Sequence, residues 1–166
     1  KTLGIPSLFQ CTDDSQHSEI KFCKPEIGYV KNMKASIRKV LNFLRFYPPY
    51  LGAGVSVKHI NEDMTSITVQ MKMRFWNRNY VGTHFGGSLY SMCDPWYMFI
   101  LLEHLGKECV IWDKSAEIDF VSPGKGTMTA TFEIDHQTIG RLREQAQDNQ
   151  KHLPVFHTSV IDEDGQ

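Results

Sequence analysis

The chain has 166 residues, of which 41% are hydrophobic, so it can form the core of one globular domain, with or without an extension. Lysine and arginine number 18 against 19 aspartate and glutamate, and a net charge of −1 predicts no broad attraction to nucleic acid. The longest apolar stretch, residues 96–102, is far shorter than the ~20 residues of a membrane span. With no signal-peptide pattern at the N-terminus, we expect a cytoplasmic protein whose partners are small molecules or other protein chains.

The first 30 residues show weak periodicity and scattered polar side chains, which predicts an N-terminal extension ahead of one domain at residues 31–166. From Met33 to Leu44, apolar side chains recur at helical spacing. This pattern predicts an amphipathic helix that ends before Pro48.

A strand hairpin and a buried helix are expected next. Apolar and polar residues alternate at 55–58 and at 67–75, on either side of the turn-like residues 61–63, which predicts two antiparallel strands. The stretch from about Gly87 to Leu105 is strongly apolar and predicts one long, largely buried helix.

Extended character returns between Val110 and Val121, and strict alternation at 127–134 predicts a further strand. A polar helix from about Gln137 to Asn149 and a strand from about Val155 to Asp162 follow. The chain then reaches Asp164-Gly165, a common hairpin turn with no returning strand. We therefore expect a C-terminal strand to be missing from this chain or to be supplied from outside it.

The strongest functional signal lies between Asn79 and Asp94. Gly86 and Gly87 begin the predicted buried helix, and paired glycines let another group approach the free backbone N–H groups there. Such a helix end can hold an oxyanion, with Asn79 before the loop and Asp94 inside the helix as candidate polar groups. A Gly-Gly pair is also common in ordinary loops, so the signal depends on the fold around it.

The order of elements favours an α+β fold in which a sheet packs around a central helix. It resembles the hotdog fold, in which a curved antiparallel sheet wraps one long helix. The segment from Asn79 to Asp94 resembles phenylacetyl-CoA thioesterases of that fold, which carry an Asn, a His-Gly-Gly or similar triplet and an Asp at matching separations. Residues 82–98 (GTHFGGSLYSMCDPWYM) and 110–114 (VIWDK) look closer still to an uncharacterised thioesterase-like branch. The resemblance covers about residues 33–166.

Two positions depart from the pattern of these relatives. Phe85 stands where many of them have the histidine before the glycine pair, and His84 lies one place earlier. Pro95 follows the aspartate and removes one helical N–H bond, which predicts a kink in the helix at the site.

The resemblance implies hydrolysis of an acyl thioester, such as an acyl-CoA ester. The Gly87 N–H would stabilise charge on the carbonyl oxygen, Asp94 would activate a water or attack directly, and Asn79 would orient water or substrate. Four further residues would bind substrate: His84, Phe85, Gly86 and Ser91. Because such sites lie between two subunits, the resemblance also implies a homodimer or a homotetramer built from two dimers, with Asn79 and Asp94 of one site on different chains.

Other interpretations of the same residues stay open. Dehydratases of this fold use a histidine at the helix entrance, which suits His84 and a 3-hydroxyacyl thioester substrate, and the fold can also hold an acyl chain or CoA without turnover. Ser91 can equally bond back to the helix carbonyls. No His or Cys spacing suits a metal ion, so we expect neither a metal site nor another cofactor. Four basic residues can contact CoA phosphates or simply be solvated: Arg74, Arg78, Lys114 and Lys125.

Overall fold

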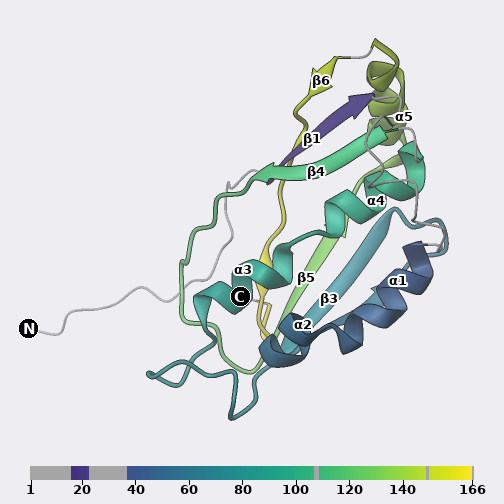
Figure 1. The fold of residues 1–166 in the computed structure, drawn as a ribbon. Helices are drawn as coiled ribbons and strands as arrows, with labels where there is room; N and C mark the ends of the chain where they lie inside the picture. Colours follow the sequence, from purple (N-terminus) through teal and green to yellow (C-terminus); the bar gives the residue numbers. More distant parts are fainter. Residues whose placement is uncertain (1–15, 23–36, 107–108, 149, 166) are drawn as a thin grey trace, which may run out of the picture.

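The computed structural model describes residues 16–22, 37–106, 109–148 and 150–165 (Figure 1). In chain order the elements are β1 (Gln16–Phe22), α1 (Ile37–Phe43), the 3-10 helix η1 (Leu44–Phe46), α2 (Pro48–Ala53), β2 (Val55–Ile60), β3 (Ser66–Lys72), α3 (Gly86–Cys93), α4 (Trp96–Leu105), β4 (Cys109–Ser115), β5 (Thr127–Glu133), α5 (His136–Gln145), the 3-10 helix η2 (Ala146–Asp148), β6 (Lys151–His152), β7 (Val155–Phe156) and β8 (Val160–Ile161).

The strands form two antiparallel groups that share one segment of chain. One group has the order β2-β3-β5-β8, and in the other β1 lies between β4 and β6 and also pairs with β7. Because β6, β7 and β8 all lie within residues 151–161, this segment joins both groups into one curved sheet. Helices α3 and α4 lie between the β4 side and the β3–β5 side of that sheet (Figure 1). This arrangement confirms the predicted α+β hotdog fold.

An interior strand of the sheet comes from the N-terminal part of the chain, where the sequence predicts an extension. Strand β1 pairs with β4 on one side, with Ile20 opposite Ile111. On its other side β1 pairs with β6, where Ile20 lies opposite His152, and with β7. Residues 16–22 therefore fill the position between β4 and the segment 151–161.

The apolar stretch predicted as one helix consists of two, and the break falls at Asp94 and Pro95. Helix α3 ends at Cys93, and Asp94 has extended backbone angles (φ −79°, ψ 147°). Pro95 has no N–H to donate and its ring clashes with a continuing helix, which explains why α4 starts afresh at Trp96. The Trp96 indole N–H donates to the Met92 carbonyl (2.6 Å), which satisfies one of the carbonyls left open at the end of α3.

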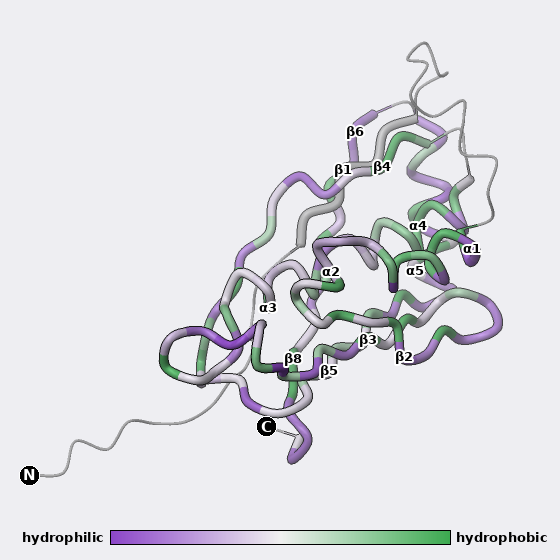
Figure 2. Tube along the Cα trace, turned by 60° about the horizontal axis from the view of Figure 1, so that its bottom comes forward, coloured by the Kyte–Doolittle hydropathy of each residue, from purple (hydrophilic) through white to green (hydrophobic). Residues whose placement is uncertain are grey.

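The core forms where α4 meets the inner faces of β3 and β5. Alternate residues of β3 (Ile67, Val69 and Met71) and of β5 (Met128, Ala130 and Phe132) are at most 1% exposed. Three residues of α4 are equally buried: Trp96, Ile100 and Leu101. Aromatic rings extend this core, since Tyr97 packs edge-on against Phe132 and stacks on Phe156. Figure 2 shows α4 as a hydrophobic segment inside the fold. In the described part of the chain, no helix is both long enough and apolar enough to cross a bilayer.

Two predicted boundaries were wrong, and one short helix was not predicted. Pro48 ends α1 and η1 as expected, but it also opens α2, because proline suits the first turn of a helix. Strand β3 ends at Lys72, so Phe75, expected on the inner face, is 79% exposed in the following loop. Strand β4 stops at Ser115, well before Val121. These ends depend on tertiary packing, which local alternation does not report.

Candidate functional site

The loop before α3 is organised by the Asn79 side chain. Its amide nitrogen donates to Thr83 Oγ1 (2.7 Å) and to the His84 carbonyl (3.2 Å). Its amide oxygen accepts from the backbone N–H groups of Val81 (3.1 Å) and Thr83 (3.0 Å). Asn79 therefore holds the loop in shape directly in front of the helix entrance, and its amide group is fully hydrogen-bonded within the chain.

His84 ties this entrance to the loop before β5 from the inside. The residue is 3% exposed, and its backbone N–H donates to the Gly124 carbonyl (2.9 Å). Its Nε2 lies 2.9 Å from the Gly126 carbonyl, which can only accept, so Nε2 carries the proton. The other ring nitrogen, Nδ1, is buried and has no hydrogen-bond partner among the described residues. Burial lowers the pKa of His84 below its ordinary value, so the ring is neutral at physiological pH.

Gly86 and Gly87 open α3, and two aromatic rings lie against them. A Cβ on Gly86 would lie 3.2 Å from the Phe120 ring, and a Cβ on Gly87 only 2.5 Å from the Phe85 ring. Both phenylalanines are more than half exposed. No side chain caps this end of α3, so the helix presents N–H groups beside an apolar, solvent-facing surface.

Asp94 lies at the other end of α3, in the break before α4. Its side chain is exposed, yet nearby protein atoms displace enough water to raise the pKa of its carboxyl. Within the described residues no hydrogen bond or ion pair to this carboxylate is found. The backbone carbonyl of Asp94 accepts from the Tyr50 hydroxyl (2.8 Å), which anchors the break to α2. Burial raises the pKa of the Tyr50 phenol, and the nearby Asp94 carboxylate raises it further.

Within one chain, Gly87 and Asp94 are held apart. They stand at opposite ends of α3, and seven residues of α-helix span about 10 Å. A hydrogen bond needs ~3 Å, so one small reacting group cannot contact both residues of the same chain. Ser91, between them, donates to the Ser88 carbonyl (2.9 Å) and so bonds back to its own helix.

The loop between β3 and α3 exposes an unusual amount of aromatic surface. Phe75, Trp76 and Tyr80 are 79%, 56% and 105% exposed, and Val81 is 76% exposed. In Figure 1 this loop extends away from the body of the fold. Large apolar side chains that gather in one exposed loop commonly mark a contact surface.

Two residues near the site escaped the sequence prediction. Tyr50 lies 44 positions before Asp94, and Phe120 lies 34 positions after Gly86, so no local spacing links them to the motif. Among the described residues no cluster of three or more His, Cys, Asp or Glu side chains is placed to hold a metal ion.

Residues 35–166 match the model of a protein family described as a domain of unknown function, DUF4442. The chain belongs to this family. No curated protein matches the chain significantly. The match to DUF4442 covers nearly all of the described fold, including every candidate residue from Asn79 to Asp94.

Two solved structures share the fold of this DUF4442 chain. One is PA5026 from Pseudomonas aeruginosa, a protein of unknown function described as a probable thioesterase, with 16% identity and a TM-score of 0.61 over 81% of this chain and 89% of that one. The other is a candidate thioesterase from Shewanella oneidensis, with 14% identity and a TM-score of 0.50 over 74% of this chain and 95% of that one. At such low identity the likeness establishes the fold alone.

Proposed function

We propose that this chain hydrolyses acyl thioesters, with acyl-CoA esters as the substrate class, at a site completed between two copies of the chain. The observation that carries the proposal is the Asp94 carboxylate, which has no partner within the described residues and a raised pKa. A raised carboxyl pKa brings a base closer to the pH at which it works best. The thioesterase descriptions of the two similar structures support the same reaction class.

In the proposed reaction, the thioester carbonyl oxygen accepts a hydrogen bond from the Gly87 N–H at the positive end of α3. Asp94 removes a proton from a water molecule as the water oxygen bonds to the carbonyl carbon. Direct attack by the Asp94 carboxylate is the alternative route. The carbon–sulfur bond then breaks, the thiolate leaves and takes a proton, and the products are a carboxylic acid and a free thiol.

The separation of about 10 Å along α3 supports a site built from two chains. Asn79 and Gly87 belong to one helix entrance, because Asn79 bonds to the His84 carbonyl just before it. In the proposed dimer this entrance faces Asp94 of the partner subunit. Phe85, Gly86 and Ser91 then contact the acyl group, while His84 positions the loop from beneath.

The proposed reaction needs only water and these side chains, so it requires no cofactor. Acyl-CoA esters and their hydrolysis products are diffusible small molecules, which fits the proposed cytoplasmic location. A dehydratase reaction with His84 as the base is less well supported, because Nδ1, the ring nitrogen free to accept a proton, is buried away from solvent. The choice between enzyme and non-catalytic binder rests on the following measurement.

Replacing Asp94 with Asn is expected to lower kcat for acyl-CoA hydrolysis by about 100-fold or more, since a positioned general base contributes roughly 10²–10⁴. The amide keeps the size of the carboxylate but cannot accept the proton. Steady-state release of free CoA thiol from a panel of acyl-CoA esters measures the effect. Glu103→Gln, on the exposed face of α4, is the matched control and should keep the wild-type rate.

Sedimentation and circular dichroism on each variant show whether the assembly and fold are retained. Wild-type turnover by Asp94→Asn would refute the proposed role of Asp94. Absence of turnover in the wild type, together with saturable acyl-CoA binding, would instead identify a binding protein.

A further inference from the structure

A concave surface with no residue in common with the site at α3 lies between α1–η1 and β2. It encloses about 680 Å³ and is lined by four side chains that are basic, Arg38, Arg45, Lys58 and His59, over aliphatic residues such as Leu41 and Val57. None of its lining residues carries a carboxylate. The groove therefore combines positive charge from a helix and a strand with an apolar floor.

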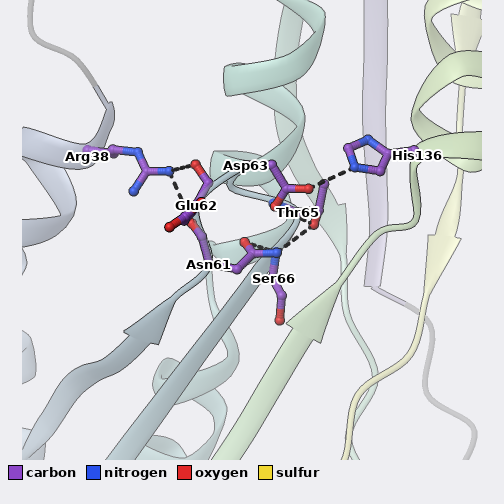
Figure 3. Close-up of polar contacts among 7 residues, drawn as sticks. All are labelled: Arg38, Asn61, Glu62, Asp63, Thr65, Ser66 and His136. Atoms are coloured by element: carbon purple, nitrogen blue, oxygen red, sulfur yellow. Dashed lines mark hydrogen bonds and ion pairs between the residues drawn. The ribbon is translucent and has the colours of Figure 1, made fainter.

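One wall of this groove is fixed by Arg38. Its guanidinium on α1 donates to the backbone carbonyls of Asn61 (3.1 Å) and Glu62 in the turn between β2 and β3 (Figure 3). Two polar side chains of the turn fix it in place: Asn61 Oδ1 accepts from the Ser66 N–H (2.9 Å), and Asp63 contacts His136 of α5 (2.8 Å). Helix α1 is thereby fastened beside β2, so the groove is built into the fold.

The opposite wall of the groove is strand β2, which is irregular at the basic residue Lys58. Strand β2 pairs with β3 alone among the described strands, and the register shifts between Val57 and His59, which leaves Lys58 without an opposite residue. A bulge of this kind re-aims side chains and is frequent at sheet edges beside binding sites. Five consecutive residues of β2, 56–60, line the groove, so it follows the edge of this strand and not one face alone, since strand neighbours normally point to opposite faces.

We propose that this groove binds a small molecule that carries phosphate groups. Guanidinium groups match phosphate oxygens through paired N–H donors, and Lys58 adds a further positive charge. The volume falls within the range of about 300–1,000 Å³ that is typical of small-molecule sites. The apolar floor suits a ligand with an organic part as well as its phosphates. The nucleotide end of CoA and a separate phosphorylated molecule share this chemistry.

The proposal stands apart from thioester hydrolysis and is tested by binding, with pyrophosphate as the probe. Calorimetric titration of the full chain at low salt is expected to show saturable binding at millimolar concentration or below, which weakens as salt is added. Arg45→Gln combined with Lys58→Gln should weaken it by about tenfold or more, because charge-assisted hydrogen bonds are lost. These two exposed residues are chosen because Arg38 also holds the turn.

Lys39→Gln is the matched control, since Lys39 is exposed on the same helix and does not line the groove. It should change pyrophosphate affinity by less than about twofold, as expected of a solvated surface charge. Competition by CoA and by adenosine 3′,5′-bisphosphate would identify the CoA nucleotide as the ligand; pyrophosphate binding without such competition would indicate a separate phosphorylated molecule. No saturable binding, or equal affinity in the double variant and the control, would show that the charges only protect the edge of β2.

Discussion

His84 is a titratable group that is kept neutral inside the protein, and this has a consequence for stability. Burial lowers its pKa from the ordinary value of 6.5, so below that pH the unfolded chain takes up a proton that the folded chain refuses. The contribution of the neutral His84 ring to the free energy of unfolding is therefore fully present above pH 6.5 and is lost as the pH falls below that value. One proton bound by the unfolded state alone changes stability by at most ~1.4 kcal/mol per pH unit.

Replacing His84 should therefore make the protein less sensitive to acid. In His84→Gln the amide can still donate to the Gly126 carbonyl. The melting temperature of this variant should fall less between neutral pH and pH ~5 than that of the wild type. The difference should amount to a few degrees, because ~1 kcal/mol corresponds to about 2–4 °C in a chain of this length. His157→Gln, which replaces an exposed histidine, is the control and should keep the wild-type dependence of melting temperature on pH. Equal acid sensitivity in both variants would contradict a neutral, buried His84.

At the scale of single residues, the sequence predicted which positions gather at the helix entrance but not what each side chain contacts. The bonds from Asn79 to Val81 and Thr83 are local, and asparagine commonly makes such bonds in turns. The contact between Tyr50 and Asp94 is different, since it depends on how α2 packs on the break before α4. Spacing along the chain carries no information about such a pair.

Among the elements, strands with a clean alternation of apolar and polar residues were predictable, because one face is buried. Strand β3 and strand β5 show this alternation in their burial. Strand β1 gives a weak signal in isolation because its sequence, QHSEIKF, is mostly polar, and its partners lie about 90 and 130 positions further along the chain. The break at Pro95 was expected as a kink, and the structure extends it to a full interruption between two helices.

A proline in β1 tests whether this strand is part of the sheet. Ile20 lies between Ile111 and His152, so Ile20→Pro removes a backbone N–H from a strand that is paired on both sides. We expect a loss of about 3 kcal/mol or more in the free energy of unfolding, measured by denaturant titration. Ile20→Ala retains the N–H and should cost less. If the proline variant were as stable as the alanine variant, β1 would not belong to the folded sheet in solution.

For the whole molecule, the exposed loop between β3 and α3 bears on assembly. Tyr80 and Val81 are both largely exposed, and they lie next to Asn79, whose side chain shapes the helix entrance. A second copy that covers this loop would bury its aromatic surface, and the loop adjoins the entrance at which the proposed two-chain site is completed. No feature of the sequence alone distinguishes such a partner surface from an ordinary loop.

We therefore expect the wild type to sediment as a dimer or larger assembly at micromolar concentration. Tyr80→Asp combined with Val81→Asp should weaken the dimer by about tenfold or more, because two charges would be buried at the interface. Phe43→Asp is the control, since Phe43 is 74% exposed on α1 and outside this loop, and it should leave the assembly intact. A monomeric wild type would exclude the two-chain site.

The interior position of β1 also bears on how the chain reaches its fold. Residues 16–22 are made early, but their neighbours in β6 and β7 emerge only after residue 150. Pairing across so long a stretch is slow, because a large loop must close before the contacts can form. Until residues 151–156 have been made, the edge of β1 that faces away from β4 has no partner strand. Folding of the sheet should thus wait for residues 151–156, and until they are made the unpaired edge of β1 is open to chaperones and to aggregation.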